Sequence, residues 1–417
     1  MTTPNFKRTK LACYTSYFTM SSVFSLPPLL FITLREMYGI SYTLLGTLVL
    51  VNFCTQLAID LTFTFFSKHF NVGFLVRIMP LLTSAGLLLY ALSPTLFPNH
   101  VYVGLLIGTV IFSVAAGLSE VMLSPMIAAI PSKNPGRDMS LLHSLYAFGV
   151  FSVVMLSAAF FALFGTEHWT YLTMFFALLP IIAAVLFMLS PIPDMTPAEQ
   201  QGQMSVKRTW RRTVGLGLCV ACIFFGSCAE NAMSSWISGF METALHMDKA
   251  LGDILGMALF AILLGLSRIA YAAYAKHIYR VLLVGMIGAA VCYVLVGVTG
   301  GVVIPAVACI LTGLFTSMLW PGTLILMEEN IHGAGIAAFA LMAAGGDMGA
   351  SVAPQLLGIV TDVVSASHFA TEMGFRYGLT PDQVGMKVAM LTCAIFPILG
   401  IVVLLFIRRH FRHGKIE

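Results

Sequence analysis

Four acidic residues lie deep inside apolar stretches of the sequence: Asp60, Glu120, Glu230 and Asp347. No Lys or Arg occurs at a comparable depth in those stretches, and Asp253 lies at the edge of one, where we expect it to be hydrated. A carboxylate in apolar surroundings is costly unless it is protonated, hydrated or beside a cation. We therefore expect at least one of the four to couple to a proton or Na⁺. The alternative is that they are protonated carboxyl groups that hydrogen-bond neighbouring helices.

Polar residues recur around these acids at three- and four-residue spacing, which places them on one face of a helix. Such a face would meet protein or water rather than lipid, and it could serve a hydroxylated ligand, a cation or helix packing. Sodium could bind near Asp60 or Asp347, because residues with oxygen-bearing side chains share the helix face of each. The predicted polar faces are Asn52, Gln56 and Asp60; Ser113, Gly117, Glu120 and Ser124; Ser227, Glu230, Asn231, Ser234 and Ser238; and Asp347, Ser351 and Gln355.

Several aromatic residues lie in the same apolar stretches and could stack on the face of a sugar. We single out Tyr146, Trp236 and Trp320 as substrate-binding candidates, although aromatic side chains in such stretches often only pack the interior. His143 is a further candidate, because an imidazole can relay protons near neutral pH.

The composition places these residues in a membrane. Of the 417 residues, 59% are apolar and 10% are charged, whereas soluble domains carry about 25% charged residues. So few polar side chains cannot cover a water-facing surface, which excludes a cytosolic enzyme, a secreted disulfide scaffold and a nucleic-acid-binding protein. An all-helical polytopic membrane protein remains.

Apolar runs of about 20 residues each span a bilayer as a helix. The sequence contains twelve, and the first, at 24 residues with no cleavage site after it, is too long for a signal peptide. The predicted spans are 11–34, 43–66, 74–93, 103–129, 140–164, 170–190, 214–240, 252–274, 281–298, 303–327, 336–363 and 387–407.

Basic residues predict the orientation, since cytoplasmic loops are enriched in Lys and Arg. With both termini in the cytoplasm, all but four of the 22 basic residues fall on the inner side. The exceptions are Arg35, Lys249, Arg376 and Lys387. The long inner segment 191–213 then separates two six-helix halves, 1–190 and 214–417. Short, weakly similar motifs recur in the same order in both halves, which favours the architecture of a secondary transporter.

Other chemistry has little support in the sequence. The eight cysteines all fall in apolar stretches, and Cys219 and Cys222 form a pair without a second pair to complete a metal site. No motif of a metalloprotease, a serine hydrolase or a P-loop enzyme occurs. We expect no enzymatic activity, no cofactor, no bound metal and no nucleic-acid partner, and we expect a monomer in the lipid bilayer.

Three groups of residues resemble the major facilitator superfamily, and more narrowly its fucose/galactose/glucose permease branch. The first joins Glu120 to Ser124, Pro125, Phe148 and Gly149; the second is Ala229, Glu230, Ser235 and Trp236; the third is Trp320, Pro321, Gly345, Gly346 and Pro354. The resemblance implies that Glu120 couples to protons or contacts the substrate. It also implies that the helices of Asp60 and Asp347 meet between the halves. The sequence departs from the sugar/proton symporters in having no acid between Leu11 and Leu34.

Together these features predict a secondary active transporter in a bacterial inner membrane. It would move a small polar solute, a monosaccharide or derivative, by alternating access coupled to protons or sodium. A proton-coupled exporter of cationic or amphipathic compounds and a non-transporting membrane sensor are the alternatives.

Overall fold

In a computed structural model, the chain is described over residues 6–66, 70–132, 135–193, 210–274, 277–331 and 335–411. All of its regular elements in these ranges are helices. They include twelve helical segments that are long and apolar enough to cross a membrane, which confirms the predicted number. Helices suit a bilayer because lipid offers no hydrogen-bond partners and a helix satisfies its own backbone N–H and C=O groups.

Six spans precede residue 190. The helices that form them are α1 (Lys7–Tyr38), α2 (Tyr42–Phe66), α3 (Val72–Leu96), α4 (Val101–Ala129), α5 (Pro135–Phe164) and α6 (Trp169–Met188), with a short 3-10 turn at Thr166–His168 before α6.

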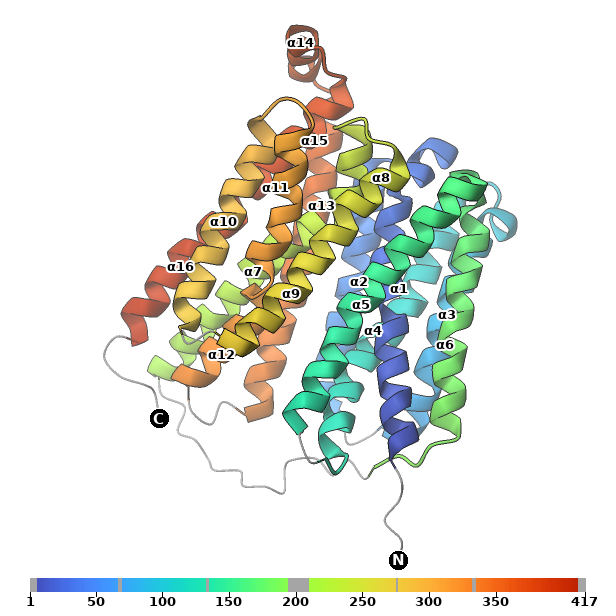
Figure 1. The fold of residues 1–417 in the computed structure, drawn as a ribbon, viewed down its shortest axis with the longest axis vertical. Coiled ribbons are helices and arrows are strands. Elements are labelled where there is room, and N and C mark those ends of the chain that lie inside the picture. The colour runs from blue at the N-terminus through green and yellow to red at the C-terminus, as the bar shows by residue number, and fades with distance from the viewer. Residues whose placement is uncertain are drawn as a thin grey trace, which may run out of the picture. The chain divides into compact units, whose positions relative to one another are not determined.

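The last six spans are more irregular. Their helices are α7 (Trp210–Thr243), α8 (Lys249–Asp253), the π-helical turn η4 (Ile254–Ala258), α9 (Leu259–Tyr274), α10 (Ile278–Val298), α11 (Val303–Thr316), α12 (Leu319–Asn330), α13 (Gly335–Ser365), α14 (His368–Tyr377), α15 (Pro381–Cys393) and α16 (Ile395–Phe411). The eighth span therefore runs through α8, η4 and α9, while the tenth and twelfth are each divided in two. The extra helix α14 lies between the predicted spans 336–363 and 387–407 and extends beyond the ends of α13 and α15 (Figure 1).

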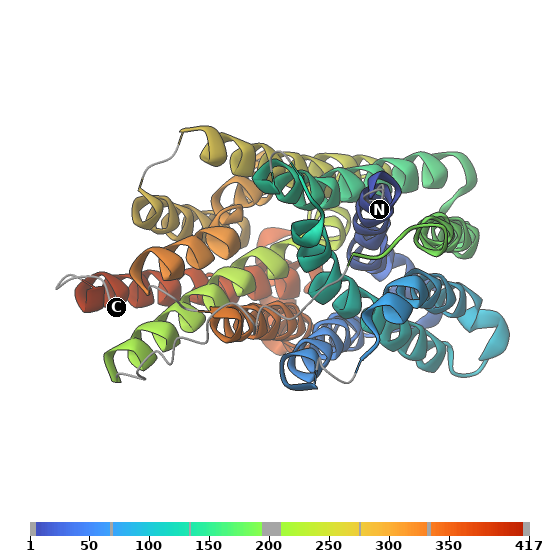
Figure 2. The same cartoon turned by 90° about the horizontal axis from the view of Figure 1, so that it is seen from below.

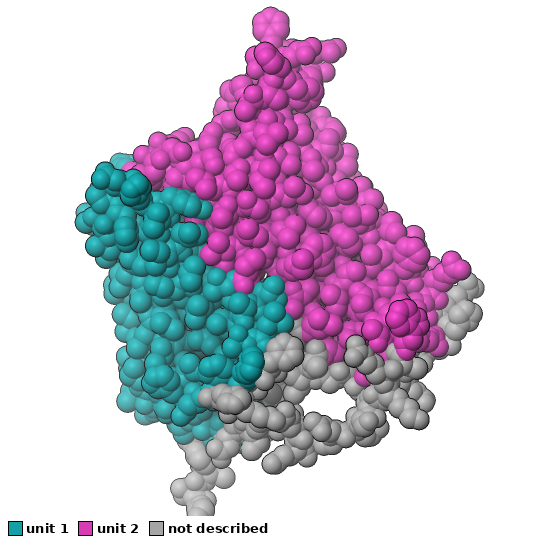
Figure 3. Space-filling model, turned by 180° about the vertical axis from the view of Figure 1, so that it is seen from behind, with its two compact units in different colours: residues 1–27, 55–206 teal, residues 28–54, 207–417 magenta. Residues whose placement is uncertain are grey.

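The chain forms two compact units, shown in different colours in Figure 3. Unit 1 comprises residues 1–27 and 55–206, and unit 2 comprises residues 28–54 and 207–417. The predicted halves also divide at the linker 191–213, of which 194–209 lie outside the described residues. Residues 28–54, which the prediction assigns to the first half, belong to the second unit.

Each unit is held together by close contacts between helices. In unit 1, α3 packs on α4 and α6. An added Cβ at Gly86 of α3 would lie only 2.9 Å from the Gly108 carbonyl oxygen of α4, so both helices depend on glycine at that point. In unit 2, α13 packs along α7 and α15, and these helices lie side by side in Figure 2.

Candidate functional site

The candidate site residues form two groups, one in each unit. In unit 1, Asp60 on α2 and Glu120 on α4 interact electrostatically. Gly117 brings the two helices together, because a Cβ at that position would lie 3.2 Å from the Cα of Gln56 and 3.0 Å from the Cβ of Ile59. Glu120 follows one turn later on the same face of α4. Asp60 is 7% exposed, and Glu120 is partly buried.

Two neighbouring carboxylates in a membrane span repel each other, so ionising both has a free-energy cost. A proton shared between them, or a small cation bound by their oxygens, removes that cost. Gln56, one turn before Asp60 and 1% exposed, adds an amide on the same face of α2. This arrangement can therefore bind a proton or an alkali cation.

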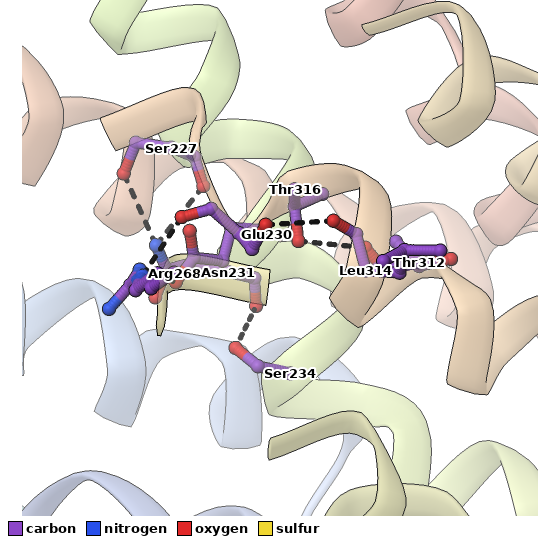
Figure 4. Close-up of polar contacts among 9 residues, drawn as sticks. Ser227, Glu230, Asn231, Ser234, Arg268, Thr312, Leu314 and Thr316 are labelled. Carbon is purple, nitrogen blue, oxygen red and sulfur yellow. Dashed lines mark hydrogen bonds and ion pairs between the residues drawn. The ribbon is translucent and has the colours of Figure 1, made fainter. Parts of the chain in front are cut away.

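In unit 2, Glu230 on α7 forms an ion pair with Arg268 on α9, as Figure 4 shows. Arg268 Nη2 lies 3.4 Å from Glu230 Oε1. Glu230 is 18% exposed and Arg268 is 33% exposed. Among the described residues, Glu230 Oε2 is buried and has no hydrogen-bond partner. The ion pair thus uses one oxygen of the carboxylate and leaves the other unsatisfied.

A break in the tenth span holds Arg268 in place. Helix α11 ends at Thr316 and α12 begins at Leu319, so the backbone between them departs from regular helix geometry. Arg268 Nε donates to the carbonyl oxygen of Ser317 at 2.9 Å. Backbone groups released by a broken membrane helix need such a partner, because lipid offers none.

The expectation that Glu230 has no basic neighbour is wrong, because Arg268 reaches it. The predicted topology counts Arg268 among the basic residues of the inner segments and adjoining helix ends, on the basis of its position in the sequence. A helical side chain points back towards the N-terminus of its own helix, and the long arginine chain extends several ångströms further. For a helix such as α9, both effects move the guanidinium towards the middle of the span. These rules predict from the sequence that the Arg268 guanidinium enters the span, but they do not predict its partner.

Asp253 is also not the hydrated residue that we expected. It is 1% exposed, lies 3.6 Å from the ammonium of Lys249 and accepts a short hydrogen bond from Ser238. Lys249 also lies 3.3 Å from Glu242 and donates to the carbonyl oxygen of Leu29 at 2.6 Å. The i,i+4 spacing of Lys249 and Asp253 is the signal in the sequence that could have predicted the pair.

The remaining polar residues of α7 continue the face that carries Glu230. Asn231 donates to the carbonyl and hydroxyl oxygens of Ser227, at 3.1 and 3.2 Å, and Ser234 donates to the Asn231 carbonyl at 3.4 Å (Figure 4). Asn231 and Ser234 are partly exposed. Hydrogen bonds thus link Ser227, Asn231 and Ser234 along α7, whereas Ser238 donates to Asp253.

A second row of unit 2 contains Asp347, Ser351 and Gln355 on α13. Asp347 is 3% exposed, and the Ser351 hydroxyl donates to the Asp347 backbone carbonyl at 2.7 Å. Cys54, near the 6%-exposed Asn52 on α2, lies 3.8 Å from the Ser351 hydroxyl. Gln355 packs where Gly46 lacks a side chain, since an added Cβ there would lie 3.1 Å from Gln355 Oε1.

The two predicted tryptophans have different surroundings. Trp236 is fully buried between Phe31 and Tyr42, and its indole N–H donates to the Pro354 carbonyl at 3.0 Å. Stacking on a substrate would require these contacts to open. Trp320 is partly exposed, and its ring lies on the backbone of Gly346, directly before Asp347.

Tyr146 and His143 belong to α5 in unit 1. Tyr146 is partly exposed and contacts Phe24 edge-on, with the ring centroids 5.7 Å apart. The side chain of His143 lies outside the described part of the structure. Among the described residues, no three His, Cys, Asp or Glu side chains form a group that could hold a metal ion.

The chain has the fold of known membrane transporters. It superimposes on a D-xylose–proton symporter with a TM-score of 0.76 and 15% identity, over 96% of each chain. A bacterial homologue of the human lysosomal transporter Spinster gives a TM-score of 0.76 at 11% identity over 100% of each chain. The fucose:proton symporter of E. coli gives 0.56 at 14% identity, over 95% of this chain and 99% of that one.

No curated protein matches the sequence. The family model of the Major Facilitator Superfamily matches residues 12–354. This match covers most of the chain and agrees with the twelve spans. The chain is therefore a multi-pass membrane transporter that belongs to the Major Facilitator Superfamily.

Proposed function

We propose that the chain is a cation-coupled transporter that takes up a small polar solute, a monosaccharide or derivative, by alternating access. Asp60 and Glu120 form the cation site, and the row that includes Glu230 and Asn231 contacts the solute. We further propose that the protein lies in a bacterial inner membrane with both termini in the cytoplasm, as the distribution of Lys and Arg indicates.

The observation that carries the coupling is the close packing of α4 on α2 at Gly117, which brings the carboxyl groups of Asp60 and Glu120 within electrostatic reach of each other. Adding one proton or one Na⁺ to such a pair changes its net charge and its interaction with the surrounding helices. If the site is stable only with the cation bound, cation binding shifts the equilibrium between the conformations of the transporter. The same pair without a cation would hold two like charges together in a low-dielectric span.

The choice of solute has a different basis. Amide, hydroxyl and carboxyl groups on α7 suit a solute with several hydroxyl groups, and Trp320 is a partly exposed aromatic ring that could stack on it. Two of the solved structures that share the fold are sugar–proton symporters. These likenesses support a monosaccharide as the first class of solute to test.

The test is uptake of labelled D-xylose, L-fucose and D-galactose into proteoliposomes under an imposed proton or sodium gradient. We expect at least one sugar to accumulate with one gradient. Glu120→Gln should abolish accumulation but retain sugar exchange at equilibrium, because exchange requires no net movement of the cation. Glu372→Gln makes the same chemical change at an exposed site on α14 and should leave accumulation unchanged.

Three outcomes would contradict this assignment. Uptake that ignores both gradients would exclude coupling. Full accumulation by Glu120→Gln would remove that residue from the cation site. Outward movement of a cationic compound against inward protons, with no sugar uptake, would support an exporter instead.

A further inference from the structure

The contacts of Arg268 identify a group that the proposed cation site does not use. A guanidinium has five N–H donors. Arg268 directs Nε at the Ser317 carbonyl and Nη2 at Glu230 Oε1. Its remaining donors make no hydrogen bond to any of the described residues, although the side chain is only 33% exposed. Arg268 is therefore fixed in position by a backbone oxygen and still has donors to offer.

The pairing with Glu230 is incomplete. A strong arginine–carboxylate pair has two parallel hydrogen bonds of about 2.7–2.9 Å. Here a single contact of 3.4 Å joins the two groups, and Glu230 Oε2 has no partner among the described residues. A second carboxylate with better geometry could compete with Glu230 for the guanidinium. A proton that binds to Glu230 would remove the competitor.

Other charged groups do not take the place of Arg268 beside Glu230. Within the described structure, Arg268 is the charged group that interacts with the Glu230 carboxyl. Lys249, on α8, pairs with Asp253 and Glu242, and Lys387, on α15, donates to the Thr299 carbonyl at 2.8 Å. On α10, the Tyr293 hydroxyl donates to the Ala229 carbonyl at 2.8 Å. The charge of this site thus depends on Glu230, Arg268 and whatever solute binds there.

We propose that Arg268 binds the carboxylate of the transported solute, and that a proton on Glu230 makes it available. The solutes then include a sugar acid, a monosaccharide derivative that carries a carboxylate. This inference rests on the proposed function, which it deepens by naming the charged group of the solute. Asn231 and Ser234, on the same face of α7, supply hydrogen bonds for the hydroxyl groups of that solute.

Charge balance explains why the proton and the solute would move together. The ion pair of Glu230 and Arg268 is neutral. A protonated Glu230, a charged Arg268 and a bound carboxylate are also neutral in sum. With only the proton bound the site carries one positive charge, and with only the solute bound it carries one negative charge. Each ligand therefore favours the other, which is positive coupling between two sites.

The experiment compares two isosteric probes, D-glucuronate and D-glucuronamide, in calorimetric titrations of the purified full chain. The wild-type protein should bind glucuronate about tenfold or more tightly at pH 6 than at pH 8, the usual scale of coupling between two sites. Glucuronamide has no charge and should show neither this preference nor this pH dependence. Glu230→Gln should bind glucuronate at pH 8 as tightly as the wild type does at pH 6.

Variants of Arg268 separate binding from a structural role. Arg268→Gln should lose the preference for glucuronate over glucuronamide. If this variant fails to fold, the double variant Arg268→Gln with Glu230→Gln leaves no lone buried charge and should show the same loss. Arg376→Gln, at an exposed site on α14, is the matched control and should keep the preference.

The proposal is overturned if the wild type binds the two probes equally or binds neither. It is also overturned if the Arg268 variants retain the preference for glucuronate. Gradient-driven uptake of a neutral sugar, measured separately, decides the proposed function. A protein that accumulates D-xylose but does not distinguish the two probes would refute the anion site and leave cation-coupled transport standing.

Discussion

Asp138 shows how a single residue can link two helices near the end of a span. It lies in the first turn of α5 and forms a short ion pair with Lys10 of α1, while the Tyr14 hydroxyl lies 3.4 Å from its backbone carbonyl. An acid in the first turn also faces the positive end of the helix dipole. The hydrogen bond from Lys10 holds the pKa of the Asp138 carboxyl below its ordinary value of 3.8.

The lowered pKa predicts a dependence of stability on pH. The folded protein holds the ionised form of Asp138 more strongly than the unfolded chain does, so the stabilisation is complete above pH 3.8 and disappears as the pH falls through the lower folded pKa. Asp138→Asn should lower the melting temperature at pH 6 and show a smaller change than the wild type between pH 5 and pH 3. Thermal unfolding in detergent measures this, with Glu372→Gln as the control. Equal pH dependence in Asp138→Asn and the wild type would contradict it.

At the same scale, the sequence predicts which acids enter the membrane better than it predicts their partners. Depth follows from the length of the apolar run around Asp60 or Glu230. The partner of Glu230 is 38 residues away on another helix, and that contact depends on how α7, α9 and the break before α12 pack. Hydropathy carries no information about such packing.

At the scale of the element, close helix contacts depend on single glycines. Helix α13 packs along α7, and Gly349 lies against the Phe224 backbone carbonyl, where an added Cβ would collide. A backbone carbonyl in a helix cannot change its position as a flexible side chain can change its rotamer. The two helices would have to move apart to accept any larger residue.

Gly349→Ala should therefore destabilise the protein by about 1–3 kcal/mol, the usual cost of an overpacked contact. Gly217→Ala is the matched control on α7, because a Cβ at Gly217 meets no atom within 4 Å. Melting temperatures of the two purified variants, compared with the wild type, measure the difference. A Gly349→Ala protein as stable as Gly217→Ala would show that the helices separate without cost.

The twelve spans could be predicted from the sequence because each is a long apolar run. The interruptions within these spans could not be predicted from the apolar runs. The π-helical turn at Ile254–Ala258 and the break between α11 and α12 leave the hydropathy unchanged. Helix α14 has Ser367 as its N-cap and Gly378 as its C-cap in the left-handed conformation, a capping pattern that could have predicted it.

At the scale of the whole molecule, the grouping of residues 28–54 with unit 2 reflects specific contacts. Arg35 lies 3.2 Å from Asp382, and the backbone N–H groups of Tyr42 and Thr43 donate to Asp362 at 3.2 and 2.6 Å. Asp362 therefore caps the start of α2 from α13. The sequence places Asp362 at the end of the predicted span 336–363 and Asp382 in the loop after it, and nothing in it joins either acid to α2.

The predicted orientation can be tested by labelling engineered cysteines. In a background where Cys54, the exposed native cysteine of the described chain, is replaced by Ser, Glu372→Cys should react with a membrane-impermeant maleimide in intact cells. Gln201→Cys, in the basic linker, should react only after the membrane is permeabilised. The opposite pattern would invert the topology and place the basic segments outside, against the usual distribution of Lys and Arg.

The central claim is that solute and cation cross the membrane together. The most direct measurement follows the cation while the solute provides the driving force. Proteoliposomes with a trapped pH indicator or sodium indicator, and no imposed ion gradient, receive an inward gradient of a transported sugar or sugar acid. We predict that the internal pH falls or the internal sodium rises as the solute enters, and that Glu120→Gln abolishes this change while exchange continues. Solute entry with no change in either cation would contradict the account.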